Sequence, residues 1–311
     1  CIRDRVVTVL LLTELKHTFT EFAQRMKNDE MITLAKFLAI SGIILPMLPH
    51  KNLIPDINLT PYSIWLATVV VSGISYLSYL LKRYVFHESG TLVSGIIGGL
   101  YSSTATISVL ARKSRKASEL EATDYVAAML LAVSMMFLRF MILILIFSRE
   151  IFLSIYPYLL TMAVVAAIVA WFIHSRQKRP EDQPAETEED DSSNPLEFKV
   201  ALIFAVLFVI FTFLTHYTLV YAGTGGLNLL SFLSGFSDIT PFILNLLQNT
   251  GSVAALIITA CSMQAIISNI MVNMFYALFF AGKGSKLRPW ILGGFGVVIT
   301  CNLVLLLFFY I

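Results

Sequence analysis

Residues 89–111 read SGTLVSGIIGGLYSSTATISVLA, and residues 223–247 read GTGGLNLLSFLSGFSDITPFILNLL. Both stretches are apolar enough to enter a lipid bilayer. Both are also dense in Gly, Ser and Thr, and the second contains Asp238 and Pro241. Gly and Pro weaken a helix interior, whereas Ser, Thr and Asp favour the starts of helices. The two stretches therefore predict helices that break inside the membrane.

The composition of the whole chain favours a membrane protein. Apolar residues make up 57% of the 311 positions, charged residues make up 14%, and the mean hydropathy is +0.78. Soluble domains carry about a quarter charged residues. The net charge of +2 gives no reason to expect nucleic acid as a partner. Cys1, Cys261 and Cys301 are far apart, so we expect no disulfide framework, metal or cofactor.

A transmembrane helix needs roughly 20 predominantly apolar residues, and nine segments of the chain approach that length. They are residues 32–49, 61–81, 91–111, 124–147, 151–173, 198–222, 226–248, 252–281 and 289–311.

The basic residues near the membrane ends decide how these segments cross. If all nine cross, Lys and Arg divide evenly between the two sides, against the positive-inside tendency. If 91–111 and 226–248 instead turn back, all of these residues except Lys51 and Arg149 lie on one side. We therefore predict an all-α polytopic protein with about seven full spans, two re-entrant hairpins and cytoplasmic basic loops.

The same topology makes one half of the chain an inverted copy of the other. Gly99–Thr104 aligns with Gly235–Thr240, a shared G-x-x-x-x-T at the middle of each broken segment. The predicted regions are the end of a preceding membrane domain with an amphipathic connector (1–31), a first membrane repeat (32–174), a disordered acidic cytoplasmic linker (175–197) and a second membrane repeat (198–311). Transporters of this design bind solutes where their broken helices meet.

Two ionisable residues fall at membrane depth. Arg139 lies well inside segment 124–147, and Asp238 lies at the predicted tip of the second hairpin. Such groups usually pair or line a pathway. We hypothesise that the two interact across the repeat interface. In a functional reading they form a gate or bind a charged solute, and in a structural reading they form an ion pair or cap a half-helix.

Small and hydroxyl residues surround both predicted tips, where half-helix ends can bind ions. Each one could alternatively cap a helix, bond the preceding turn or, for Gly99, allow close helix packing. Asn269 shares a face of segment 252–281 with Asn273 and could line a path or join helices. The candidate substrate-binding residues are Gly99, Ser102, Ser103, Thr104, Arg139, Gly235, Asp238, Thr240 and Asn269.

Several stretches together resemble a known family of bacterial and archaeal membrane domains. They include LKHTFTEFAQRM (15–26), GGLYSSTAT (98–106) and NPLEFKVALIFA (194–205). The chain is similar to the domain of unknown function 4010, which is commonly fused C-terminal to an MgtC/SapB-type membrane domain. The resemblance implies a membrane location and a missing MgtC/SapB-like partner domain, which fits the short apolar run at 6–12. It implies no established activity.

We expect a transporter-like or channel-like protein that moves or binds a small polar or ionic solute at the interface of two inverted repeats. The alternative is a non-transporting regulatory or scaffolding subunit that acts with an MgtC/SapB-like domain. The sequence contains no H-E-x-x-H, G-x-S-x-G or P-loop motif, so we do not expect an enzyme. The expected location is the bacterial or archaeal cell (inner) membrane, with the lipid bilayer as a partner and a homo-oligomer as a possibility.

Overall fold

The computed structural model describes residues 28–54, 57–86, 90–115, 119–176, 198–248, 253–282 and 287–310. Most of the predicted preceding domain and connector (1–31), and most of the predicted acidic linker (175–197), lie outside the described residues. In the described part of the chain all regular structure is helical, apart from an isolated bridge between Ile54 and Ile57.

The helices follow the predicted apolar segments closely. They are α2 (Asn28–Met47), α3 (Pro61–Leu80) with a π-helical extension η1 (Leu81–Val85), α4 (Thr91–Lys113), α5 (Glu119–Phe147), α6 (Arg149–Ser175), α7 (Phe198–Ser234), α8 (Ile239–Gln248), α9 (Ala255–Ala281) and α10 (Arg288–Tyr310). Within the described residues, 8 helices are long and apolar enough to cross a membrane, and α8 is a shorter apolar helix.

Local sequence signals set the starts of the regular spans. Thr60 caps α3 and forms a capping box with Ser63, while Pro61 occupies the first turn, where its missing N–H is not needed. Ser148 caps α6 by accepting a hydrogen bond from the N–H of Ile151. These caps satisfy backbone donors that the helix itself leaves free.

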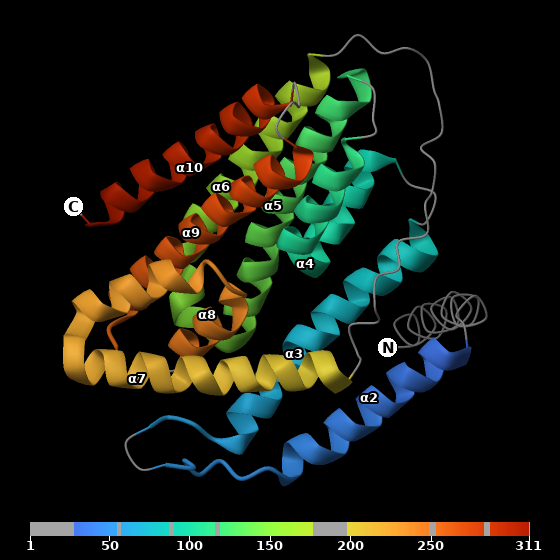
Figure 1. The fold of residues 1–311 in the computed structure, drawn as a ribbon. Coiled ribbons are helices and arrows are strands. Elements are labelled where there is room, and N and C mark those ends of the chain that lie inside the picture. The colour runs from blue at the N-terminus through green and yellow to red at the C-terminus, as the bar shows by residue number, and fades with distance from the viewer. Residues whose placement is uncertain are drawn as a thin grey trace, which may run out of the picture.

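Helix α4 is broken at its centre and folds back on itself. Ser102 has an extended backbone (φ −159°, ψ 107°) between two helical halves, residues 91–101 and 103–113. A Cβ built on Gly98 would lie 2.5 Å from Oγ1 of Thr106. In a continuous helix, residues eight positions apart are separated by about 12 Å along the axis. The two halves therefore lie side by side as a hairpin (Figure 1).

A second reversal follows the long helix α7. Gly223 interrupts α7 with a left-handed backbone (φ 59°, ψ −152°), which glycine adopts without a steric penalty. The chain continues to Ser234, turns through residues 235–238 and begins α8 at Ile239. The end of α7 and α8 form the second broken unit. The prediction of about seven full spans and two broken helices is confirmed.

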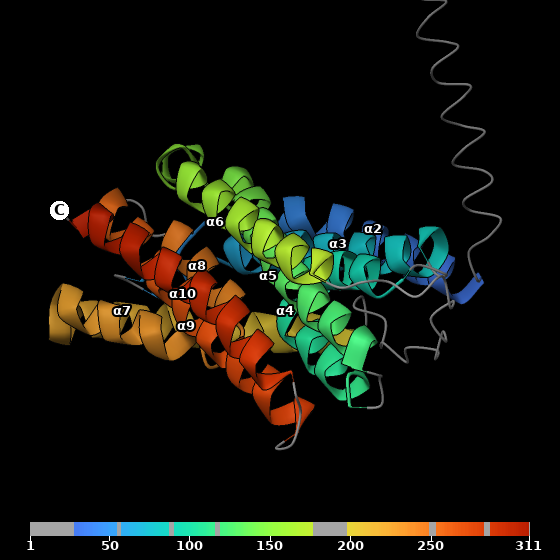
Figure 2. The ribbon, with the colours of Figure 1, turned by 90° about the horizontal axis from the view of Figure 1, so that it is seen from above.

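The remaining helices build a bundle around these two units. Helix α5 packs against α4 and α6, while α10 lies beside α9 and α6, as the view in Figure 2 shows. Large side chains such as Phe137, Phe242 and Phe295 fill the interior. The basic end of α4 meets the end of α9, because Arg115 Nη2 donates to the carbonyl of Phe279 at 3.1 Å and Arg112 stacks on Phe280.

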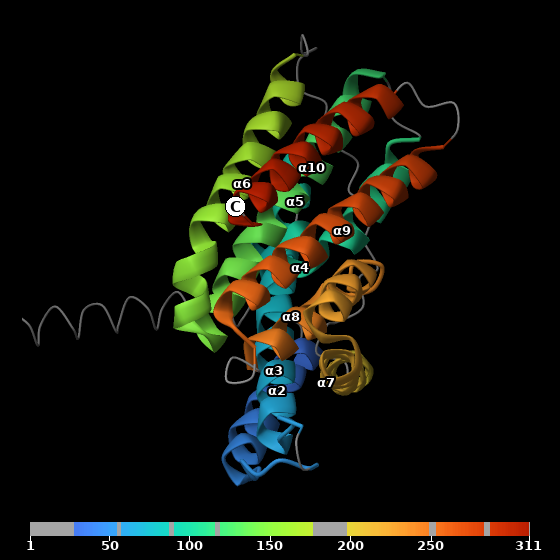
Figure 3. The same ribbon diagram turned by 90° about the vertical axis from the view of Figure 1, so that its left-hand side faces the viewer.

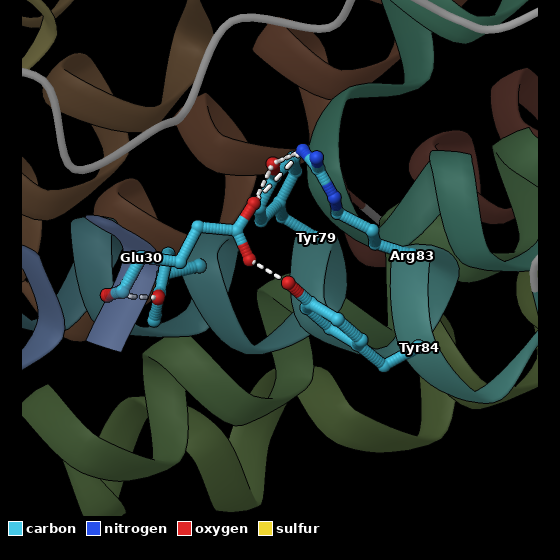
Figure 4. A network of polar contacts seen from close by, with 5 residues as sticks. Glu30, Tyr79, Arg83 and Tyr84 are labelled. Carbon is cyan, nitrogen blue, oxygen red and sulfur yellow. Dashed lines mark hydrogen bonds and ion pairs between the residues drawn. The ribbon is translucent and has the colours of Figure 1, made fainter. Parts of the chain in front are cut away.

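Helix α2 lies at the edge of the bundle and contacts α3 (Figure 3). A polar cluster at Glu30 holds it there. Figure 4 shows Tyr79, Arg83 and Tyr84 converging on the Glu30 carboxylate. The Tyr79 hydroxyl donates at 2.8 Å, and Arg83 Nη1 lies 2.8 Å from Oε1. Glu30 is buried, so these donors offset the loss of its hydration.

Candidate functional site between two broken helices

A cavity of about 440 Å³ lies where the two broken units meet. We call residues 101–104 the first tip and residues 235–240 the second tip. The cavity is lined by both tips and by residues of α3, α5, α7 and α9. Its polar lining consists of Ser72, Ser75, Tyr101, Ser102, Ser103, Thr104, Arg139, Ser237, Asp238, Thr240, Asn269 and Tyr276. Polar backbone at membrane depth is tolerated where such a cavity or surrounding protein replaces lipid.

The first tip is organised by Ser102 and Arg139. The Ser102 hydroxyl accepts a hydrogen bond from the N–H of Ala105 at 3.3 Å, so Ser102 caps the second half of α4. The break leaves carbonyls at the end of the first half without helical partners. Arg139 Nη1 reaches from α5 and donates to one of them, the carbonyl of Tyr101, at 2.8 Å. Arg139 therefore stabilises the break itself.

The second tip is organised by Asp238. Its Oδ1 accepts a hydrogen bond from the N–H of Thr240 at 2.9 Å, which makes Asp238 the cap of α8. The hydroxyls of Ser234 and Ser237 donate to the carbonyls of Ser231 and Ser234 and complete the turn. The start of α8 therefore faces the cavity with a carboxylate at its cap position.

Helix α9 packs against the second tip and forms hydrogen bonds with it. Asn269 Nδ2 donates to the carbonyl of Gly235 at 3.3 Å, and Asn273 Nδ2 donates to Asn269 Oδ1 at 3.1 Å. A Cβ on Gly235 would lie 2.3 Å from Oγ of Ser268. Gly235 is therefore required for the tip to approach α9 closely. The two asparagines share one helical face, as their spacing predicts.

The structure brings most of the predicted site residues together. Eight of them line the cavity: Gly99, Ser102, Ser103, Thr104, Arg139, Asp238, Thr240 and Asn269. Gly235 does not line it, and supports the tip through its carbonyl and its contact with α9. Gly99 also packs tightly, because a Cβ there would lie 2.5 Å from Cα of Ala132. For both glycines close packing accounts for the residue type. Whether any of these residues binds a solute stays a prediction.

Arg139 and Asp238 face the same cavity without forming an ion pair. Among the described residues, ion pairs join Arg83 to Glu30 and His174 to Asp124. Arg139 instead uses Nη1 on the Tyr101 carbonyl, and its Nε is buried without a hydrogen-bond partner. The two side chains therefore form no direct ion pair, and an interaction between their charges across the cavity stays a prediction.

Five polar lining residues were not among the predicted site residues: Ser72, Ser75, Tyr101, Ser237 and Tyr276. Ser72 and Ser75 lie on α3, three positions apart on one helical face, and Tyr276 lies on α9. Hydroxyls in an apolar segment are a weak signal, because Ser and Thr often bond the preceding turn, as Ser78 does here with the Ile74 carbonyl. In the part of the chain that the structure describes, no group of three His, Cys, Asp or Glu side chains is placed to hold a metal ion.

The fold and the cavity define a polytopic α-helical membrane protein with two broken helices at its centre. The chain belongs to the family described as "Domain of unknown function (DUF4010)", whose model matches residues 69–281. The matched region contains both tips and Arg139. The chain is also similar to an "Uncharacterized protein" of Aquifex aeolicus (strain VF5), with 25% identity over 227 residues, covering 71% of this chain and 96% of the relative. No solved structure matches.

Proposed function

We propose that this protein is transporter-like or channel-like, and that it moves or binds a small polar or ionic solute in the cavity between the two tips. The observation that carries the proposal is the meeting of both broken helices at one cavity of about 440 Å³. This volume falls within the range of about 300–1,000 Å³ that is usual for small-molecule sites. Exposed half-helix ends are the parts from which transporters with broken helices build their binding sites.

A repeated packing arrangement supports the proposal that the two halves are inverted repeats. Gly99 packs against Ala132 on α5, and Gly235 packs against Ser268 on α9. The offset in sequence from Gly99 to Gly235 is the same as the offset from Ala132 to Ser268. The same offset separates Thr104 from Thr240. The G-x-x-x-x-T pattern therefore comes with the same glycine-to-helix contact in both halves, as expected for two copies of one unit.

The proposal includes no enzymatic step. It places the chain in the bacterial or archaeal cell membrane, with the basic end of α4, and the end of α9 that it contacts, on the cytoplasmic side, in keeping with the positive-inside tendency. A partner beside α2 is compatible with the exposed apolar side chains of that helix, such as Leu38 and Ile43. An MgtC/SapB-like domain or a second copy of this chain are the candidates for that partner. Lipid also covers such a surface.

Solvent access to the cavity from both sides of the membrane tests the proposal without knowledge of the solute. In a background with Cys1, Cys261 and Cys301 replaced by Ser, single variants Thr104→Cys and Ser237→Cys place a thiol at each tip. A membrane-impermeant thiol reagent is applied to sealed vesicles of either orientation. We expect both thiols to react from both sides, because a solute pathway connects the cavity to each face.

A matched control is Leu303→Cys, which lies on the exposed apolar face of α10 and should resist a charged reagent from either side. Reaction of the tip thiols from one side only, or from neither, contradicts a pathway. That result would favour the alternative, a non-transporting regulatory or scaffolding subunit.

A further inference from the structure

We infer that the solute is a zwitterion, a small molecule with one carboxylate and one ammonium group, and that Arg139 and Asp238 receive its two ends. The inference rests on the proposed function, because it names the chemical class of the solute in the same cavity. It comes from a difference between the two tips. They occupy matching positions in the two halves, yet the first has a positive charge beside it, from Arg139 on α5, whereas the second itself carries a negative charge, from Asp238.

The first tip is suited to a carboxylate. Arg139 uses Nη1 for the Tyr101 carbonyl, and its buried Nε has no hydrogen-bond partner among the residues that the structure describes. A guanidinium stays charged and offers five donors in a planar fork that matches a carboxylate. The N–H groups of Ser103 and Thr104 lie in the first turn of the second half of α4, where helices leave donors free and attract anions. The guanidinium of Arg139 and the start of the second half of α4 thus both favour a carboxylate.

The second tip is suited to an ammonium group. Asp238 places a carboxylate at the start of α8, and only Oδ1 is engaged, with the Thr240 N–H. Pro241 has no N–H, so this helix start offers one donor fewer to an anion. The Asp238 charge further opposes anions. The helix start that could bind an anion is therefore already occupied by the protein's own carboxylate.

Arg139 and Asp238 do not neutralise each other through a direct ion pair. In the described part of the chain, no ion pair joins Arg139 to Asp238. Charges inside a membrane protein are costly unless a partner compensates them. A simple anion would meet the Asp238 charge, and a simple cation would meet the Arg139 charge. A zwitterion compensates both and leaves the cavity with no net change in charge.

The rest of the lining suits a short carbon skeleton. Phe140, Phe204 and Leu207 line the cavity beside the two charged residues. Apolar walls with a few convergent polar groups are typical of small-molecule sites, and 440 Å³ lies near the lower end of their size range. This favours a small solute with an apolar backbone between its two charged ends.

Ligand-dependent thermal unfolding of the purified full chain tests the inference. The probes are glycine, β-alanine, 4-aminobutanoate and 6-aminohexanoate, which differ in the spacing of their charges. Butanoate and butylamine at the same ionic strength each lack one charge. Binding to the native state raises the unfolding midpoint, and at equal concentration a tighter ligand raises it more. We expect at least one zwitterion to raise the midpoint, and both singly charged probes to raise it far less.

Two variants test whether Arg139 and Asp238 bind the two charged ends of the zwitterion. Arg139→Gln and Asp238→Asn should each weaken binding of the active zwitterion at least tenfold, while Arg149→Gln, an exposed residue outside the cavity, should leave it unchanged. If a cavity variant does not fold, the comparison of probes on the unaltered chain still decides the matter.

An equal shift with butanoate would overturn the inference in favour of an anion, and an equal shift with butylamine would overturn it in favour of a cation. No shift with any zwitterion in the series would also overturn it. The thiol-access experiment tests the solute pathway separately. The inference that the solute is a zwitterion can therefore be wrong while the proposed function holds.

Discussion

At the scale of single residues, the tips depend on glycine for close packing. A Cβ on Gly99 would lie 2.5 Å from Cα and 2.6 Å from the carbonyl oxygen of Ala132, atoms that cannot rotate away. By contrast, nothing lies within 4 Å of a Cβ built on Gly73 in α3. The two positions therefore separate the effect of a contact from the effect of glycine on helix propensity.

Gly99→Ala is expected to destabilise the protein, because overpacking of this kind costs about 1–3 kcal/mol. Gly73→Ala should leave stability unchanged or raise it, since Ala is a better helix former by about 1 kcal/mol. Thermal unfolding of both variants in the same detergent measures the difference. A Gly99→Ala midpoint equal to that of the unaltered chain would contradict the packing described for the first hairpin.

Asp238 has two separable roles, the cap of α8 and the negative charge in the cavity. Asn caps a helix about as well as Asp, whereas Ala loses about 0.5–2 kcal/mol of capping energy. We expect Asp238→Asn to unfold at nearly the same temperature as the unaltered chain, and Asp238→Ala to unfold earlier. Equal destabilisation by both variants would show that the charge, and not the cap, holds the second tip.

At the scale of the helices, the Glu30 cluster fixes α2 to the bundle. In Glu30→Ala, the hydroxyls of Tyr79 and Tyr84 and the guanidinium of Arg83 lose their shared acceptor. Hydrogen bonds to a charged group are worth about 1.5–3 kcal/mol each, so α2 should detach more often. Hydrogen exchange should accelerate in α2 and stay unchanged in α9. Glu150→Ala, at the exposed start of α6, is the matched control.

The two broken helices could be predicted from sequence because their signal is local. Gly, Ser and Thr gather within single segments, and the positive-inside tendency favours a topology in which those segments reverse. The position of the first break followed from the same residues, since Ser102 is both extended and a helix cap. Eight of the nine candidate residues then met at one cavity because the tips themselves meet there.

Contacts between distant helices could not be predicted in this way. The partner of Arg139 is a backbone carbonyl at Tyr101, and no side-chain pattern marks which carbonyl a break will expose. The Glu30 cluster depends on how α2 packs against α3, which brings Glu30 to Tyr79, 49 positions further along the chain. Ser72 and Ser75 resemble ordinary helix serines until the opposing tips are placed beside them.

At the scale of the whole molecule, the proposed architecture has two hairpins that enter the membrane from opposite faces and meet near its centre. The positions that flank them lie at exposed sites: Gly90 and Arg115 at the ends of α4, Thr224 at the start of the second unit, and Ala254 after it, at the start of α9. Single cysteines at these four positions, in the cysteine-free background, report the side on which each end lies.

The most direct measurement is therefore their labelling by a membrane-impermeant thiol reagent in vesicles of known orientation. Two hairpins of this kind require that Gly90→Cys and Arg115→Cys react from one side, the cytoplasmic side, and that Thr224→Cys and Ala254→Cys both react from the other. Labelling of Gly90→Cys and Arg115→Cys from opposite sides would mean that α4 passes through the membrane, which rules out the first hairpin.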